Sequence, residues 1–179
     1  MNMKSMIAAA AVAASTVASA SIFNWTITAN EGSTLTKGSL ASYKDDTTWI
    51  RTDDFWTADN GTKASGSLNE SDWGYKYEDG TLKGWNGSTS SWLEVGKFSF
   101  GITGSINGNT EKTGGTDILW SDVLAAWKDD KAYSKTFWYG GDNGDALSGT
   151  ISITPEPTSG LLLLLGTGML ALRRKAVRA

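Results

Sequence analysis

Short runs of alternating apolar and polar residues constrain this chain more than any other feature of its sequence. The clearest runs cover residues 23–27, 73–77, 98–102, 134–139 and 147–153, and shorter ones cover 48–51 and 91–95. A period of two, rich in aromatic and β-branched residues, is typical of half-buried antiparallel strands. In the second run the pattern places Trp73, Tyr75 and Tyr77 on one strand face, and we expect that face to be core.

Glycine pairs that favour tight turns lie between these runs. They are Asn60-Gly61, Asp79-Gly80, Asn86-Gly87, Asn107-Gly108, Gly114-Gly115, Gly140-Gly141 and Asn143-Gly144. Such pairs tolerate the positive φ values that hairpin turns require. Asp79-Gly80 separates two alternating runs and predicts the clearest hairpin. We also expect the last strand to end at Ile153.

One segment has helical spacing instead. Apolar residues recur every three to four positions over residues 118–129, after a candidate cap at Thr116. Many short strands with one short helix predict a single antiparallel domain, either a β-sandwich or a jelly-roll-like fold.

The first twenty residues have the three parts of a secretory signal peptide. Lys4 precedes an apolar region over residues 6–18, and Ala18 and Ala20 fit the small-residue rule for cleavage. We therefore expect export through the Sec machinery and removal of residues 1–20 by signal peptidase, which leaves Ser21 as the new N-terminus. An uncleaved anchor is the alternative.

The last 25 residues also have three parts. Pro155, Glu156 and Pro157 form a short extended motif, an apolar run covers residues 159–172, and a basic end follows over residues 173–178. As a helix, residues 161–172 reach only ~18 Å, against a hydrocarbon core of ~30 Å. The basic residues, which act as a stop and stay cytoplasmic by the positive-inside rule, are Arg173, Arg174, Lys175 and Arg178.

This tail resembles the PEP-CTERM sorting signal of Gram-negative bacteria. The resemblance implies transient insertion in the inner membrane, cleavage by an exosortase at or near the Pro-Glu-Pro motif, and release to the cell surface or the extracellular space. It also implies an association with exopolysaccharide. An ordinary C-terminal anchor is the alternative. The expected organisation is a signal peptide (residues 1–20), a mature β-rich domain (21–154) and a sorting signal (155–179).

The composition of the body excludes several functions. The whole chain has a net charge of −3, but without Lys4, Glu156 and the four basic tail residues the body has 11 basic and 18 acidic residues, a net charge of −7. A body with that balance has no basic patch for nucleic acid. The chain has no Cys, so its fold contains no disulfide.

The lack of His and Cys also removes most catalytic machinery, including Ser-His-Asp triads and almost every zinc site. Paired carboxylates remain at Asp45-Asp46, Asp53-Asp54 and Asp129-Asp130. A hydrolase needs two carboxylates on one site, whereas neighbours on a strand point to opposite faces, so we expect no enzyme and no cofactor. Asp142, Asn143 and Asp145 lie in a Gly-rich loop that has the oxygen ligands of a calcium site; a plain loop is the favoured interpretation.

Tryptophan offers the best binding hypothesis. The body holds all nine Trp residues, and Trp49, Trp56, Trp73, Trp85 and Trp92 stand among Asp, Asn, Ser and Gly. We expect most of these rings to build the core, because aliphatic residues are scarce. The alternative is exposed rings that stack on sugars, with Trp73, Trp85 and Trp92 as the candidates.

These observations favour an exported surface or matrix protein with a structural or adhesive role beside exopolysaccharide. A secreted carbohydrate-binding module is the first alternative, and a hydrolase with paired carboxylates is the second.

Overall fold

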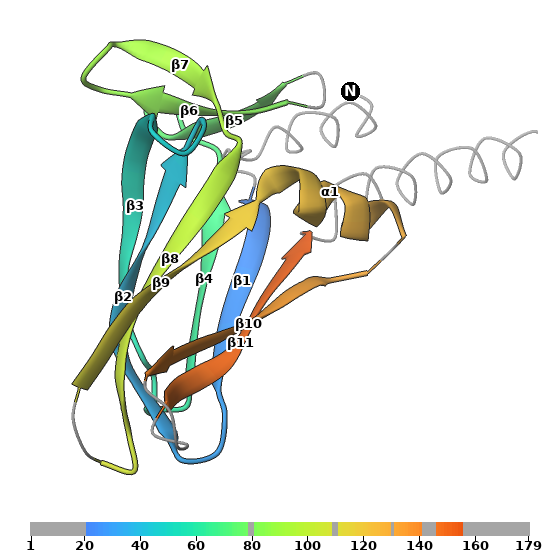
Figure 1. The fold of residues 1–179 in the computed structure, drawn as a ribbon. Helices are drawn as coiled ribbons and strands as arrows, with labels where there is room; N and C mark the ends of the chain where they lie inside the picture. The colour runs from blue at the N-terminus through green and yellow to red at the C-terminus, as the bar shows by residue number, and fades with distance from the viewer. Residues whose placement is uncertain (1–20, 79–80, 109–110, 130, 141–145, 156–179) are drawn as a thin grey trace, which may run out of the picture.

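The computed structural model describes residues 21–78, 81–108, 111–129, 131–140 and 146–155. They form a mainly β domain with one short helix, consistent with a β-sandwich (Figure 1). The elements in chain order are β1 (Ser21–Ala29), β2 (Ser33–Tyr43), β3 (Trp49–Thr57), β4 (Lys63–Asn69), β5 (Tyr75–Glu78), β6 (Thr81–Asn86), β7 (Ser91–Glu94), β8 (Lys97–Ile106), β9 (Glu111–Leu119), α1 (Trp120–Lys128), β10 (Tyr133–Gly140) and β11 (Ala146–Pro155).

Two four-stranded antiparallel sheets and one three-stranded sheet make up the domain. Sheet A has the order β10-β11-β1-β4, sheet B the order β3-β2-β8-β9, and sheet C the order β5-β6-β7. Aromatic side chains join sheets A and B face to face. Phe23 of β1 lies 5.2 Å from Phe98 of β8, and Trp25 lies 5.7 Å from Phe100, measured between ring centroids.

The alternation in β1 and β8 predicted this core correctly. Phe23, Trp25 and Ile27 are buried, as is the set formed by Phe98, Phe100 and Ile102. Strands were also correctly predicted at β10 and β11, and β5 pairs with β6 as the predicted hairpin requires. The turn residues Asp79-Gly80 lie outside the described residues.

Glycines inside strands accommodate the large core rings. A Cβ on Gly66 of β4 would lie 2.5 Å from the Trp25 indole, and one on Gly38 of β2 would lie 2.2 Å from the Trp56 indole. Both glycines are the cross-strand partners of those tryptophans. A strand glycine thus marks a place where a ring approaches the backbone closely.

The prediction of a turn at Gly114-Gly115 was wrong for the same reason. Both residues lie inside β9, and a Cβ on Gly114 would meet the ring of Tyr139 from β10 at 2.3 Å. Strands β2, β4 and β9 were not predicted, because Ser, Thr, Lys and Gly interrupt their apolar pattern.

The helix was predicted correctly, but its start was not. Thr116 and Ile118 belong to β9, and α1 begins at Trp120 with Leu119 at the N-cap and no side-chain cap. Trp120 and Val123 are buried at the end of the sandwich, where α1 takes the chain from sheet B to sheet A (Figure 1). Likewise β11 continues past Ile153 to Pro155, which is paired with Phe23.

Sheet C covers the same end of the sandwich (Figure 1). Its inner face contributes Tyr75 and Leu82 to the core, and a Cβ on Gly84 would meet Ile50 of β3 at 2.8 Å. The outer face of sheet C is therefore presented to solvent.

Candidate functional site

The outer face of sheet C carries neighbouring tryptophan rings. Trp85 of β6 and Trp92 of β7 are cross-strand partners, and their ring centroids lie 5.5 Å apart at an interplanar angle of 67°. Leu82 and Gly84 point inward, so strand alternation directs Trp85 outward. Trp73 extends the row, with its centroid 5.4 Å from that of Trp85. Together with Trp49 at the start of β3, these residues form what we call the tryptophan surface.

Trp73 is not part of a strand, so its prediction as a core residue was wrong. Strand β5 begins only at Tyr75, and Trp73 lies in the preceding turn, where it is 70% exposed. In that turn the Gly74 amide donates to the Ser71 carbonyl at 3.1 Å. Tyr75 is buried as predicted, whereas Tyr77 is 43% exposed.

The structure brings together Trp73, Trp85 and Trp92, the three candidates for sugar stacking. The two other tryptophans that stand among polar residues in the sequence differ from each other. Trp56 is buried in the core, 6.0 Å from Trp25 between ring centroids. Trp49, in contrast, is 44% exposed.

A hollow of about 310 Å³ opens in the tryptophan surface. Its lining residues are Trp49, Ile50, Arg51, Trp73, Trp85, Gly87 and Ser88. Asn86 fixes one wall, because its side-chain amide donates to the Trp49 carbonyl at 2.9 Å while its Oδ1 accepts from the Ser88 amide at 2.9 Å. The start of β3 is thereby tied to the turn between β6 and β7.

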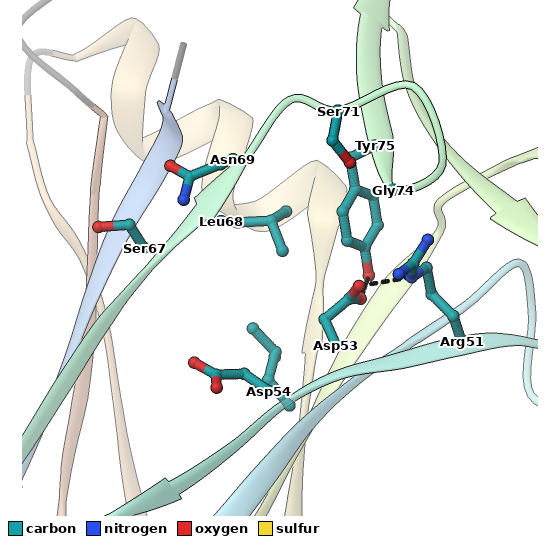
Figure 2. A pocket seen from close by; sticks show the side chains of 10 residues that line it. Arg51, Asp53, Asp54, Ser67, Leu68, Asn69, Ser71, Gly74 and Tyr75 are labelled. Carbon is teal, nitrogen blue, oxygen red and sulfur yellow. Dashed lines mark hydrogen bonds and ion pairs between the residues drawn. The ribbon is translucent and has the colours of Figure 1, made fainter. Parts of the chain in front are cut away.

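Arg51 forms the boundary between this hollow and a second cavity of about 320 Å³, shown in Figure 2. Its guanidinium donates to the Trp73 carbonyl and forms an ion pair with Asp53. The Tyr75 hydroxyl donates to the Asp53 carboxylate and is hydrogen-bonded to Ser42 Oγ at 2.7 Å. The turn that carries Trp73 thus rests on a partly buried polar network.

Burial governs the ionisation of this network. It raises the pKa of the Asp53 carboxyl above its ordinary value, although the Tyr75 hydroxyl and the Arg51 guanidinium oppose the shift. Burial, and next the nearby Asp53 charge, raise the pKa of the Tyr75 hydroxyl well above its ordinary value.

In two of the three carboxylate pairs, each described aspartate has a partner elsewhere in the domain. Asp45 accepts hydrogen bonds from the Thr47 and Thr48 amides, which lower its pKa to about 2. Asp46 forms an ion pair with Lys97 at 2.9 Å. Asp129 lies 3.8 Å from Lys131 in an exposed ion pair, and Asp130 is outside the described residues.

Asp53 and Asp54 depart from the expectation of opposite faces. Leu40 pairs with Asp54 and Ala41 with Thr52, so a register shift leaves Asp53 in a bulge. Both carboxylates consequently line the second cavity, with Asp53 directed toward Tyr75 and Asp54 directed away from it (Figure 2).

The other predicted sites lie at or beyond the limits of the described residues. Ser21 is the first residue of β1 and Pro155 the last of β11. The residues outside are Ala18, Ala20, Asp142, Asn143, Asp145, Glu156, Pro157, Arg173, Arg174, Lys175 and Arg178. Within the described ranges, no helix is long and apolar enough to cross a membrane, and no cluster of three or more acidic side chains has the arrangement of a metal site.

Sequence reasoning missed Arg51 and Asn86. Asn86 sits in an Asn-Gly pair that signals a turn, which hides its contact with β3. Nothing in the local sequence of Arg51 signals a contact with a turn 22 residues away. No family model, curated protein or solved structure matches this chain.

Proposed function

We propose that this chain is an exported surface protein whose β domain adheres to polysaccharide through the tryptophan surface. The observation that carries the proposal is the exposure of Trp73 beside Trp49 and Trp85 around one hollow. Trp has a large apolar ring with a polar N–H, and leaving several such rings together in water is costly unless a partner covers them. The apolar C–H faces of sugars suit such rings, and neighbouring hydroxyl and amide groups suit sugar hydroxyls.

Export and processing belong to the same proposal. The signal peptide and the PEP-CTERM-like tail support release to the cell surface or the extracellular matrix of a Gram-negative bacterium, with Sec, signal peptidase and exosortase as transient partners. A surface protein that adheres to exopolysaccharide unites that destination with the tryptophan surface. We further propose that sheets A and B form a jelly-roll-like variant of the sandwich, without catalytic activity.

A hydrolase remains the second candidate, because Asp53 and Asp54 line one cavity. Asp53 is already engaged by Arg51 and Tyr75, which favours a structural role for it. Release of reducing ends from polysaccharide, lost in an Asp54→Asn variant, would favour the enzyme instead.

The test of adhesion is binding of the exported protein to exopolysaccharide. Binding is measured by affinity electrophoresis and by quenching of Trp fluorescence. Trp73→Ala should weaken binding at least about tenfold, roughly 1.4 kcal/mol, because one exposed stacking ring is lost. Its unfolding free energy should change by less than about 1 kcal/mol, as for other surface substitutions.

Trp138→Ala is the matched control, since Trp138 is 57% exposed on β10 of sheet A, away from the tryptophan surface. Equal binding by wild type and Trp73→Ala would contradict the proposal, as would an equal loss in both variants.

A further inference from the structure

The relative orientation of the rings limits the shape of a ligand. Trp73 and Trp85 meet at an interplanar angle of 82°, and Trp85 and Trp92 at 67°. Neighbouring rings in this row are thus edge to face and share no plane. A flat, crystalline polysaccharide face needs coplanar rings to lie on, so this surface suits a ligand that enters between rings.

The size of the hollow limits how much of a ligand enters. Small-molecule sites in proteins have volumes of roughly 300–1,000 Å³, and the hollow, at about 310 Å³, is at the lower end. That space fits a single sugar ring and part of the next. Trp49, Trp73 and Trp85 supply ring surface to the lining, and Ser88 adds a hydroxyl group.

The charges around the hollow limit the chemistry of the ligand. Arg51 is the one charged residue among the described residues that line it, and Asp53 already neutralises that charge. On the same outer face, Lys76 and Lys83 share Glu78 at 3.0 and 3.5 Å. An anionic polymer would find these cations already paired, and the net charge of the body, −7, would repel it.

We infer that the hollow in the tryptophan surface binds one ring of a soluble, uncharged pyranose chain. The ring lies between Trp49, Trp73 and Trp85, next to Arg51. This inference rests on the proposed function and specifies its ligand. The polysaccharide enters as a single strand, and one sugar ring stacks on the indoles. Its hydroxyls form hydrogen bonds with Ser88 and with the backbone at Gly87. Ion pairing contributes nothing to the affinity.

Titration calorimetry of the exported protein tests the ligand class. The probes are soluble neutral oligosaccharides (gluco-, manno- and galacto-hexaoses), oligogalacturonate as the anionic counterpart, and microcrystalline cellulose as the flat surface. We expect binding to at least one neutral hexaose, with the same affinity at low and high salt. Trp49→Ala should weaken it at least about tenfold, or roughly 1.4 kcal/mol, and Trp138→Ala should leave it unchanged.

A second variant protects the test against unfolding of Trp49→Ala. Ser88→Trp keeps the four tryptophans and fills the hollow from an exposed position, so it should abolish binding of the neutral hexaose. Binding only to cellulose, or only to oligogalacturonate with an affinity that falls in salt, overturns this inference but leaves adhesion to polysaccharide standing. Failure to bind any of these probes or exopolysaccharide overturns both.

Discussion

Tyr75 connects the core of the sandwich to the tryptophan surface. Its ring centroid lies 6.2 Å from that of Phe98, and the Arg51 guanidinium lies 5.5 Å from the centre of its ring. Its hydroxyl is hydrogen-bonded to the partly buried Asp53 and to the buried Ser42. This one side chain therefore contributes both apolar burial and a hydrogen-bond partner for a partly buried carboxylate.

Removing that hydroxyl should be costly. Tyr75→Phe keeps the ring but takes away a hydrogen bond from Asp53, and a buried group that loses its partner costs about 1–3 kcal/mol. We expect a loss of that size in the free energy of unfolding, measured in urea. The control, Tyr77→Phe, alters a side chain that is 43% exposed and should change stability by less than about 0.5 kcal/mol. Equal stability of the two variants would show that the network contributes little.

Tryptophan burial shows why single residues are hard to place from sequence. Trp25 and Trp56 are buried because glycines stand opposite them on the neighbouring strands, whereas Trp73 is exposed because the chain turns before β5 begins. The expectation that most of the five polar-flanked tryptophans build the core was wrong, because only Trp56 among them is buried. The choice between core and surface depends on the cross-strand partner, which the local pattern does not contain.

At the scale of elements, β3 positions the turn between β4 and β5. Arg51 holds the Trp73 carbonyl with one part of its planar guanidinium and Asp53 with another. A lysine has the same charge, but its compact ammonium group cannot bind the Trp73 carbonyl and Asp53 at the same time with the planar geometry of a guanidinium. Arg51 is therefore a positioning residue for the exposed ring of Trp73.

Arg51→Lys should loosen the Trp73 turn without unfolding the domain. We expect a weaker near-UV circular dichroism signal from the Trp73–Trp85 pair and a loss of glycan affinity of about tenfold, or roughly 1.4 kcal/mol. Lys83→Arg, on the outer face of sheet C, is the control and should alter neither signal. An unchanged aromatic spectrum in Arg51→Lys would show that the turn holds Trp73 by itself.

The part of the candidate site formed by β6 and β7 was predictable, because its contacts join residues that are close in the sequence. The Asp79-Gly80 and Asn86-Gly87 pairs predicted turns at both ends of β6, and the pairing of β6 with β7 brings Trp85 beside Trp92. Trp49 and Arg51 reach the same place through the pairing of β3 with β2 and the packing of sheet C on the sandwich. Such long-range contacts leave no periodic signal in a single sequence.

For the whole molecule, the two ends of the described chain lie in one sheet. Strand β1 begins at Ser21, opposite Asn69 of β4, and β11 ends at Pro155, opposite Phe23 of β1. Asn69 leads directly into the turn that carries Trp73. The expected signal-peptide cut and the expected tail cut therefore both fall at the end of the sandwich that sheet C covers (Figure 1).

This arrangement leads to a prediction about processing. Cleavage after Ala20 and after about Glu156 or Pro157 leaves the β1–β11 pairing complete, so the processed protein should keep its full stability. While the tail is attached, it should hold the tryptophan surface toward the membrane and away from polysaccharide.

Intact mass spectrometry of surface material should find chains that begin at Ser21 and lack residues 158–179. Replacing Pro155, Glu156 and Pro157 with alanine should keep the chain in the inner membrane and reduce its binding to exopolysaccharide. Full-length chains that still carry Arg173 to Arg178 and bind as well as released protein would show instead that the tail is a permanent anchor.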